Sequence, residues 1–301
     1  MKYNQVIVVK SKTRLEQLIE RFNTKAQAKF YLERTGEDFS SIEKEHNLFY
    51  NAFENLNKLL YSLEKYKVID RSFLPNYIFT QRDLIIGIGQ DGLIANIAKY
   101  VKGQPIVGYN SNPSVYDGVL LPYSSIGLKE FNRIINGDFN SEQVTMAKAS
   151  FSDGQELLAF NDFFIGPKSH TSSRYTIHFN NESEQQSSSG IIVSTGVGST
   201  GWMSSIANMI NGIGKNKVSM RLEPDSNQLR FAVREPFISQ VSTANICGGI
   251  INSKQKLVIE SSMVNNGLVF SDGIESDFIS FNIGTAVEIS IANEKANLVQ
   301  N

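Results

Sequence analysis

The sequence predicts an α/β unit with a parallel sheet, followed by a β-rich unit of the sandwich type. In the first part, short apolar runs alternate with segments whose apolar residues recur at helical spacing. From about residue 140 the pattern changes to strands of alternating polarity separated by turn signals. At 301 residues the chain is long enough for two modest cores. We expect the units to be residues 1–137 and 138–301, and the extreme C-terminus could pack back on the first unit.

The first unit is expected to follow the order strand, helix, strand. The β-branched run Val6–Val9 predicts a buried strand, and Thr13 is placed to cap a following helix. A second helix is predicted where Phe49, Phe53, Leu56, Leu60 and Leu63 recur at spacings of four and three. Three more segments read as strand, helix and strand: Leu84–Ile86, Gly92–Val101 and Pro105–Tyr109. This order implies a parallel sheet with right-handed crossovers.

The second unit is expected to consist mainly of strands. Apolar and polar residues alternate over 174–180, and Asp153-Gly154 reads as a hairpin turn. The segment Glu182–Ser189 is polar and serine-rich, and we expect a surface loop there. The other strand candidates are Val144–Phe151, Leu157–Ile165, Ile191–Ser194, Leu229–Val233, Leu257–Glu260, Leu268–Phe270 and Val287–Ile291.

Composition and charge exclude several classes of function. Hydrophobic residues make up 41% of the chain and charged residues 20%, which is ordinary for a folded globular protein. A net charge of −1 without a long basic run gives no sign of nucleic-acid or acidic-membrane binding. The single cysteine, Cys247, fits a reducing compartment, and we expect it to be a small core residue. The sequence shows neither a signal core nor a membrane-spanning stretch, so a cytoplasmic protein is expected.

The glycine-rich segment from Gly87 to Gly92 follows a strand and precedes a helix. Its glycines satisfy the dinucleotide-binding pattern G-x-G-x-x-G, which is a weak signal alone. That interpretation also needs an acidic residue at the end of the next strand, where this chain has Tyr109-Asn110-Ser111-Asn112-Pro113. The Asp91 carboxylate would in addition repel a pyrophosphate. A dehydrogenase is therefore disfavoured.

A different interpretation makes Asp91 the centre of this loop. The flanking glycines permit a tight turn and a close approach of substrate to the backbone. The N–H groups at the start of the next helix favour a nearby anion. A carboxylate here could accept a proton from a sugar hydroxyl that attacks a phosphoryl group. The alternative is that Asp91 only caps the helix that follows it.

A second glycine-rich loop runs from Ser194 to Trp202, directly after the apolar run Ile191–Val193. Its glycines and hydroxyl residues suit a loop that cradles phosphates. The loop lacks the lysine of a P-loop, and an ordinary glycine-rich turn is the alternative. Trp202, the only tryptophan, is more often a core residue than a base-stacking one.

Together these motifs resemble those of the NAD kinase family. Gly89-Gln90-Asp91-Gly92 resembles its G-G-D-G motif, which diacylglycerol and sphingosine kinases share, and Ser194–Trp202 resembles S-T-P-T-G-S-T-A-Y. Phe160-Asn161-Asp162 is similar to the Asn-Glu or Asn-Asp pair that contacts the nucleotide, and Ser271-Asp272-Gly273 to a late D-G element. The order agrees over nearly the whole chain, and the mitochondrial-type branch is the most similar.

The resemblance implies an NAD kinase-like fold, with the active site between the α/β and β-sandwich domains. It implies transfer of the γ-phosphoryl group of ATP to the 2′-hydroxyl of the adenosine ribose of NAD, with Mg²⁺ accompanying ATP. Asp91 would be the general base. No cluster in the sequence identifies metal ligands, and a homodimer or homotetramer is expected. The implied nucleotide contacts are Gly89, Gln90, Gly92, Asn161, Asp162, Gly198, Ser199, Thr200 and Trp202.

The sequence departs from the family pattern at several positions. Gln90 replaces the second glycine of the first motif, Gly196 replaces the proline of the second, and Ser189 stands where most members have aspartate. Two alternatives therefore stay open. One is a paralogue that binds NAD(P) or ATP with little or no turnover, and the other is a related kinase that acts on a sugar or lipid hydroxyl.

Overall fold

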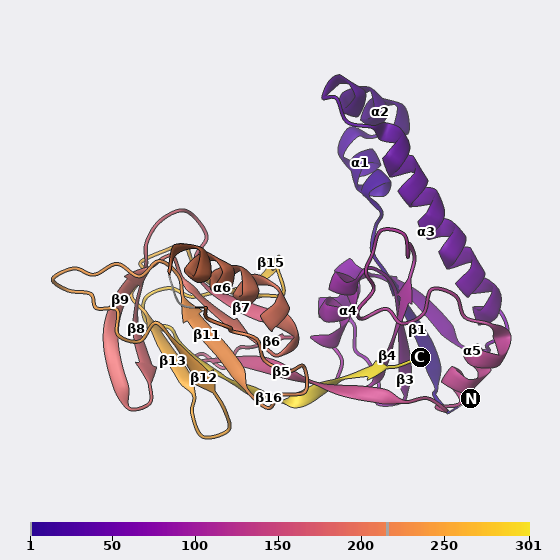
Figure 1. Ribbon diagram of the computed structural model, residues 1–301. Helices are drawn as coiled ribbons and strands as arrows, with labels where there is room; N and C mark the ends of the chain where they lie inside the picture. The colour runs from indigo at the N-terminus through magenta and orange to yellow at the C-terminus, as the bar shows by residue number, and fades with distance from the viewer. Residues whose placement is uncertain (1, 215–216) are drawn as a thin grey trace. The chain divides into compact units, whose positions relative to one another are not determined.

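The structure, a computed structural model, describes residues 2–214 and 217–301 and divides into two compact units. Unit 1 comprises Met1–Glu142 and Asn297–Asn301, and unit 2 comprises Gln143–Ala296. The division lies a few residues after the boundary expected at Gly137. The last strand, β16 (Ala286–Val299), contributes to both units, and its end lies in unit 1. Figure 1 shows the chain coloured from the N-terminus to the C-terminus.

Unit 1 is built on a parallel sheet with the strand order β2-β1-β3-β4, next to which the end of β16 adds a further parallel strand. The strands are β1 (Gln5–Lys10), β2 (Tyr66–Asp70), β3 (Asp83–Gly89) and β4 (Pro105–Asn110). β3 and β4 are buried almost throughout, as their continuous apolar runs predict. The predicted parallel sheet is therefore present.

Three helices stand between β1 and β2 and form the arm that extends from the sheet of unit 1 in Figure 1. They are α1 (Arg14–Phe22), α2 (Lys25–Arg34) and α3 (Phe39–Leu60). Thr13 caps α1 as predicted, because its hydroxyl accepts the Glu16 N–H while the Glu16 carboxylate accepts the Thr13 N–H. The short segments η1 (Arg71–Asn76), α4 (Asp91–Ala98) and α5 (Leu128–Ile135) complete unit 1. Among the described residues, no helix is long and apolar enough to cross a lipid bilayer.

Unit 2 is a sandwich of two antiparallel sheets. One contains β5 (Ser141–Phe151), β6 (Glu156–Ala159), β8 (Ser173–Phe179), β9 (Glu182–Ser188), β13 (Leu257–Ser261) and most of β16. The other has the order β12-β11-β10-β7-β14-β15. Its strands are β7 (Asp162–Pro167), β10 (Ile191–Ser194), β11 (Leu229–Val233), β12 (Gly248–Ile251), β14 (Gly267–Ser271) and β15 (Ile274–Ser280).

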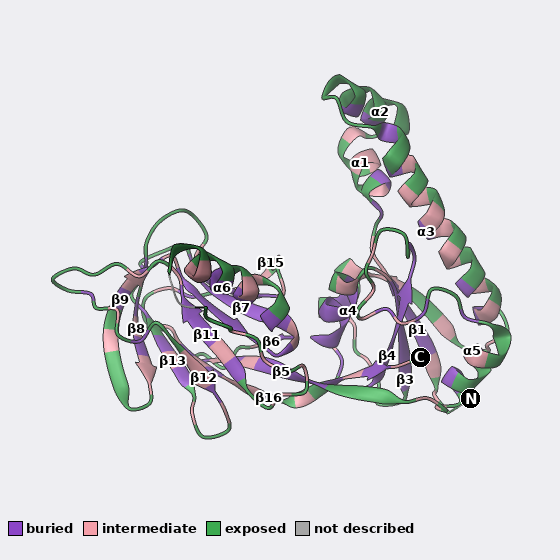
Figure 2. Cartoon of the chain, viewed as in Figure 1, coloured by how far each residue is buried: buried purple, intermediate pink, exposed green. Residues whose placement is uncertain are grey.

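The core of unit 2 contains side chains from both sheets, including Phe163, Tyr175 and Phe231. In Figure 2, β7 and β11 are drawn largely in the colour of buried residues. Helix α6 (Trp202–Ile213) covers the outer face of the second sheet, where Met203 and Ile206 pack beside Phe164. Phe163 and Phe164 therefore point to opposite faces of β7, as the period of two in a strand requires.

Three expectations for unit 2 are wrong. The polar segment expected to be a surface loop is strand β9, which pairs with β8 along its whole length. Its pairing is made possible by the turn at Asn180-Asn181, where both residues have positive φ (52° and 63°), as a two-residue hairpin requires. The single strand expected over Leu157–Ile165 is interrupted by a turn at 160–161, which separates β6 from β7. Cys247 is exposed, because it lies in the loop before β12.

Candidate functional site

The sequence-predicted site residues are divided between the two units. Gly89, Gln90, Asp91 and Gly92 belong to unit 1, at the junction of β3 and α4. The others belong to unit 2 and come from the β6–β7 turn, the loop after β10 and the start of α6: Asn161, Asp162, Gly198, Ser199, Thr200 and Trp202.

Asp91 is the first residue of α4, and its carboxylate does not cap that helix. The N-cap position is Gln90, whose side chain makes no capping hydrogen bond. Instead, Oδ1 of Asp91 accepts the backbone N–H of Leu120, from the β4–α5 connection, at 2.6 Å. The interpretation of Asp91 as a simple helix cap is therefore wrong. The half-buried carboxylate is held by a segment outside its own helix.

The glycines of this loop differ in what surrounds them. A Cβ at Gly87 would lie 2.4 Å from Cδ1 of Ile94, so this glycine allows α4 to pack closely on β3. A Cβ at Gly92 would meet no atom within 4 Å, so the space beside Gly92 is open. Gln90 has extended backbone angles (φ −121°, ψ 164°), which any residue adopts. The glutamine that replaces the family's glycine therefore causes no backbone strain.

The ends of β3 and β4 meet at the carboxyl edge of the unit 1 sheet. The N–H of Ser111 donates to the carbonyl oxygen of Gly89 at 3.4 Å, which ties the two strand ends together. The Asn110 side chain accepts the N–H of Asn112 at 2.9 Å. Asn110, the last residue of β4, and the following Ser111 and Asn112 are all buried. In open α/β sheets this edge is where ligands bind.

A cavity of about 290 Å³ lies at this edge within unit 1. Gly89 and Gln90 line one side, with Ser111 and Asn112 beside them. Lys12 and Arg14, at the start of α1, also line it, and they form ion pairs with Glu20 and Glu37 respectively. Glu45 also lines the cavity, so its lining carries charges of both signs. A phosphate-bearing ligand could pair with Lys12 and Arg14 in place of their glutamate partners. Neither cation stands in a recognisable motif, since both belong to a short polar stretch after β1.

In unit 2, the turn that carries Asn161 and Asp162 is held from two directions. The N–H of Thr195 donates to the Asn161 carbonyl at 2.9 Å, and the Thr195 hydroxyl donates to the Phe160 carbonyl at 2.6 Å. From the β14–β15 turn, the carboxylate of Asp272 accepts the N–H groups of Phe160, Asn161 and Asp162 at 3.0, 2.6 and 3.2 Å. The structure thus brings three of the sequence motifs together around one turn.

The carboxyl group of Asp162 has an unusual environment. It is 8% exposed, and burial, with a smaller contribution from the charge of Asp272, raises its pKa to about 7. Titratable groups perturbed in this way are typical of functional sites.

The glycines after β10 are surrounded by protein. A Cβ at Gly196 would lie 1.9 Å from the carbonyl oxygen of Glu223, and one at Gly198 would lie 2.0 Å from that of Asn161. The Ser199 hydroxyl donates to the Gly196 carbonyl at 2.6 Å, and the exposed Thr200 donates within the loop as well. Contacts of this loop with a nucleotide stay a prediction.

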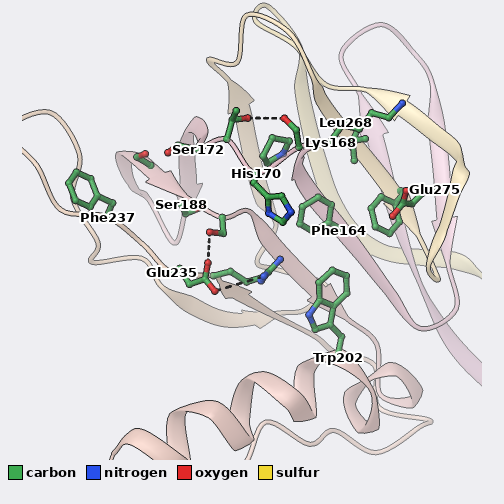
Figure 3. Close-up of a pocket in the computed structure, with 17 residues that line it drawn as sticks. Phe164, Lys168, His170, Ser172, Ser188, Trp202, Glu235, Phe237, Leu268 and Glu275 are labelled. Carbon is green, nitrogen blue, oxygen red and sulfur yellow. Dashed lines mark hydrogen bonds and ion pairs between the residues drawn. The ribbon is translucent and has the colours of Figure 1, made fainter.

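A second cavity, of about 490 Å³, lies wholly within unit 2 and is drawn in Figure 3. Trp202 lines it and stacks on Phe164, with ring centroids 5.7 Å apart and planes inclined by 9°. The guanidinium of Arg234 lies 5.4 Å from the Trp202 centroid, and Lys168 and His170 line another wall. Asn161 and Asp162 do not line this cavity. The sequence signal for this cavity is the polar segment Lys168–Ser172, which by itself predicts no site.

The described residues contain no group of three or more His, Cys, Asp or Glu side chains placed to hold a metal ion. Mg²⁺ commonly binds through one or two carboxylates together with substrate phosphates and water.

Comparisons with known proteins agree with the resemblance that the motifs predict. The chain is 26% identical over 155 residues to a curated NAD kinase from Saccharolobus solfataricus, a match that covers 51% of this chain and 60% of the relative. No protein-family model matches the chain.

Two solved structures have similar folds. An NAD kinase from Archaeoglobus fulgidus in complex with ATP aligns with a TM-score of 0.57 and 17% identity, over 99% of this chain and 94% of the other. Yeast NADH kinase complexed with NADH aligns with a TM-score of 0.59 and 12% identity, over 99% and 84%. The predicted fold class is confirmed: an α/β unit with a parallel sheet and an antiparallel β-rich unit. This is the fold of NAD kinases.

Proposed function

We propose that this protein is an NAD kinase, which transfers the γ-phosphoryl group of ATP to the 2′-hydroxyl of the adenosine ribose of NAD and produces NADP. The observation that carries the proposal is the position of Asp91. Its carboxylate follows a glycine loop at the carboxyl edge of a parallel sheet and bonds to Leu120 instead of capping its own helix. The fold and the motif resemblance support the same reaction.

In this proposal Asp91 is the general base. The N–H of Leu120 occupies Oδ1, which orients the carboxylate and directs the second oxygen to the substrate. The ribose 2′-hydroxyl gives its proton to the Asp91 carboxylate as the 2′-oxygen attacks the γ-phosphorus of ATP. ADP leaves with the electrons of the broken P–O bond. Positioning and charge neutralisation supply most of the rate enhancement in phosphoryl transfer.

The unit 1 cavity is the proposed site for the phosphates of ATP. Lys12 and Arg14 provide positive charge, and Gly89 lets the backbone approach the ligand. ATP would bind as its Mg²⁺ complex, and the metal would neutralise charge that develops on the phosphate oxygens. Gly92 does not line this cavity and lies two residues after Gln90, which does. The space beside Gly92 is open, so we place the reacting end of the phosphate chain there.

Unit 2 is proposed to bind the acceptor, NAD. Asn161 and Asp162 would contact the ribose or base through side chains that project from a turn held by Thr195 and Asp272. The Trp202 cavity suits a flat heteroaromatic ring, because an aromatic wall and cationic groups line it. Gly198, Ser199 and Thr200 are proposed to complete this region.

Two further features belong to the proposal. We place the reaction in the cytoplasm, since a chain whose one cysteine is free suits a reducing compartment.

We also infer a homodimer or homotetramer that assembles through unit 2. The exposed apolar side chains of Phe237, Ile238 and Val241 in the loop after β11 support this inference.

The test is NADP formation from ATP, Mg²⁺ and NAD, followed with an NADP-specific cycling assay. Wild-type protein should form NADP. The variant Asp91→Asn should lose about 10²–10⁴-fold in rate, the usual contribution of a positioned general base. If the wild type binds NAD and forms no NADP, the binding-only paralogue or a different phosphoryl acceptor replaces the proposal.

A further inference from the structure

Unit 2 contains two Asp-Gly turns whose carboxylates do different things. In the β5–β6 turn, Asp153 accepts the N–H and the side-chain amide of Gln155 at 3.0 and 2.7 Å, so this carboxylate serves its own turn. In the β14–β15 turn, Asp272 accepts three N–H groups of residues that lie 110 to 112 positions earlier in the chain. The second carboxylate therefore has a long-range role that a hairpin turn does not need.

The backbone of the β14–β15 turn directs the Asp272 side chain toward that partner. Asp272 and Gly273 both have positive φ (55° and 69°), and Ser271 pairs with Ile274, which defines a two-residue hairpin loop. The N–H of Asp272 also donates to the Asp162 carbonyl at 2.9 Å. The backbone N–H and the carboxylate of Asp272 thus make four hydrogen bonds with residues 160–162. This segment contains Asn161 and Asp162, the two residues proposed to contact NAD.

Three successive N–H groups around one carboxylate are costly to leave unpaired. The β6–β7 turn has no side-chain acceptor of its own among the bonds that the structure shows, and Thr195 satisfies its carbonyl groups only. The charge of Asp272 is also close enough to contribute to the raised pKa of Asp162. Without Asp272, this turn loses the acceptor that fixes its conformation.

We propose that Asp272 is a positioning residue for substrate binding. Its carboxylate fixes the backbone of Phe160–Asp162, and through it the directions in which the Asn161 and Asp162 side chains leave the turn. The inference rests on the proposed function in one respect, namely that these side chains contact NAD. Asp272 itself is not proposed to contact NAD; it affects binding through the conformation of the β6–β7 turn.

The variant Asp272→Asn isolates this role. Asparagine tolerates positive φ, so the hairpin turn is retained. One of the two acceptor oxygens becomes an NH₂ group that faces backbone donors, and the negative charge is lost. Asp153→Asn is the matched control, because it makes the same change in another Asp-Gly turn of the same unit.

Two readouts test the proposal. NAD affinity is measured from the fluorescence of Trp202, the only tryptophan, and KM values for NAD and ATP are measured beside it. Amide hydrogen exchange of residues 160–162 is measured without ligand. In Asp272→Asn we expect a dissociation constant and KM for NAD raised at least about tenfold, the factor that one lost charge-assisted bond corresponds to. We also expect an unchanged KM for ATP and faster exchange at 160–162.

A merely structural role would lower kcat through loss of folded protein and leave KM for NAD unchanged. That result, or unchanged exchange at 160–162, overturns the proposal. The outcome is separable from the proposed function, because the exchange measurement needs neither ligand nor activity. If the wild type forms no NADP while exchange at 160–162 rises only in Asp272→Asn, the kinase assignment fails and the control of this turn by Asp272 stands.

Discussion

The two glycine-rich loops of this protein look alike in sequence and differ in what lies beside their glycines. After β3, the position of a Cβ on Gly92 is open, and a Cβ on Gly89 would meet only a flexible leucine side chain at 3.5 Å. After β10, Gly196 and Gly198 lie against backbone carbonyl groups at distances that leave no room for a Cβ. The first loop is packed at Gly87 and open beside Gly92, and Gly89 has a positive φ of 153° that favours glycine. The second loop is packed by the protein itself at Gly196 and Gly198.

This difference separates two reasons for a glycine that a sequence motif cannot distinguish. A glycine whose Cα lies in close contact with backbone atoms is needed for folding, and its substitution should lower the free energy of unfolding. A glycine in open space with ordinary backbone angles is not needed for folding. Its substitution should therefore change ligand binding or activity and leave the free energy of unfolding unchanged.

The largest effect is expected for Gly198→Ala. Its Cβ would lie 2.0 Å from the Asn161 carbonyl oxygen, and backbone must move to accept it. We expect the free energy of unfolding of unit 2 to fall by about 3 kcal/mol, in the upper part of the usual range for overpacking. Urea unfolding followed by Trp202 fluorescence measures it.

Gly212→Ala in α6 is the matched control for this variant, because a Cβ there meets no atom within 4 Å. Its stability should equal or slightly exceed that of the wild type, since alanine favours a helix more than glycine does. Equal stabilities for Gly198→Ala and Gly212→Ala would contradict the packing argument.

A smaller effect, on activity alone, is expected for Gly92→Ala. Alanine at this helical position should leave stability unchanged or raise it by up to about 1 kcal/mol. The added methyl group would stand where the phosphates are proposed to approach, and kcat/KM should fall about tenfold to a hundredfold, equivalent to roughly 1.4–2.7 kcal/mol. Thermal melting and the NADP assay measure both quantities. Full activity in a stable Gly92→Ala protein would argue against this ligand placement.

The smallest effect is expected for Glu184 of β9, whose carboxylate bonds to the loop before β12 and to none of the proposed site residues. It accepts the N–H groups of Asn245 and Ile246 and the Thr243 hydroxyl. Burial opposes ionisation and is outweighed by these hydrogen bonds, which lower the pKa of Glu184 to about 2. Because the folded-state pKa lies below the unfolded one, the stabilisation is present above about pH 5 and is lost as the pH falls toward 2.

Glu184→Gln should therefore destabilise unit 2 by about 1 kcal/mol at pH 7, a value discounted for solvent screening of this partly exposed group. The difference from the wild type should narrow as the pH is lowered from 5 toward 3 in urea titrations. The KM for NAD should not change. A difference that widens at low pH would show that the carboxylate is not stabilised by these bonds.

The sequence predicts those parts of the fold whose signal is local. β10 coincides with the predicted segment Ile191–Ser194, because a short apolar run between turn residues leaves one interpretation. β9 was missed because Gln186 and Ser188 are buried polar residues, which bond to the Tyr175 hydroxyl in the folded protein. Burial of polar groups depends on partners that pattern reading does not see.

The candidate site was predictable in its motifs and not in its contacts. Asp91 was identifiable from its glycine neighbours, but its bond to Leu120 depends on how the β4–α5 connection folds back. The hydrogen bonds from residues 160–162 to Asp272 join positions more than a hundred residues apart in the sequence. The Trp202 cavity is lined by residues from several strands and loops. Such long-range contacts arise only from the packing of the whole unit.

In the proposed reaction this chain moves a phosphoryl group from ATP to NAD. The most direct measurement gives the protein NAD and ATP radiolabelled at the γ-phosphate, and it follows the label. We predict that the label appears in a nucleotide that an NADP-dependent dehydrogenase reduces, and that Asp91→Asn nearly abolishes this transfer. Label that stays in ATP and inorganic phosphate, while Trp202 fluorescence reports bound NAD, would contradict the claim.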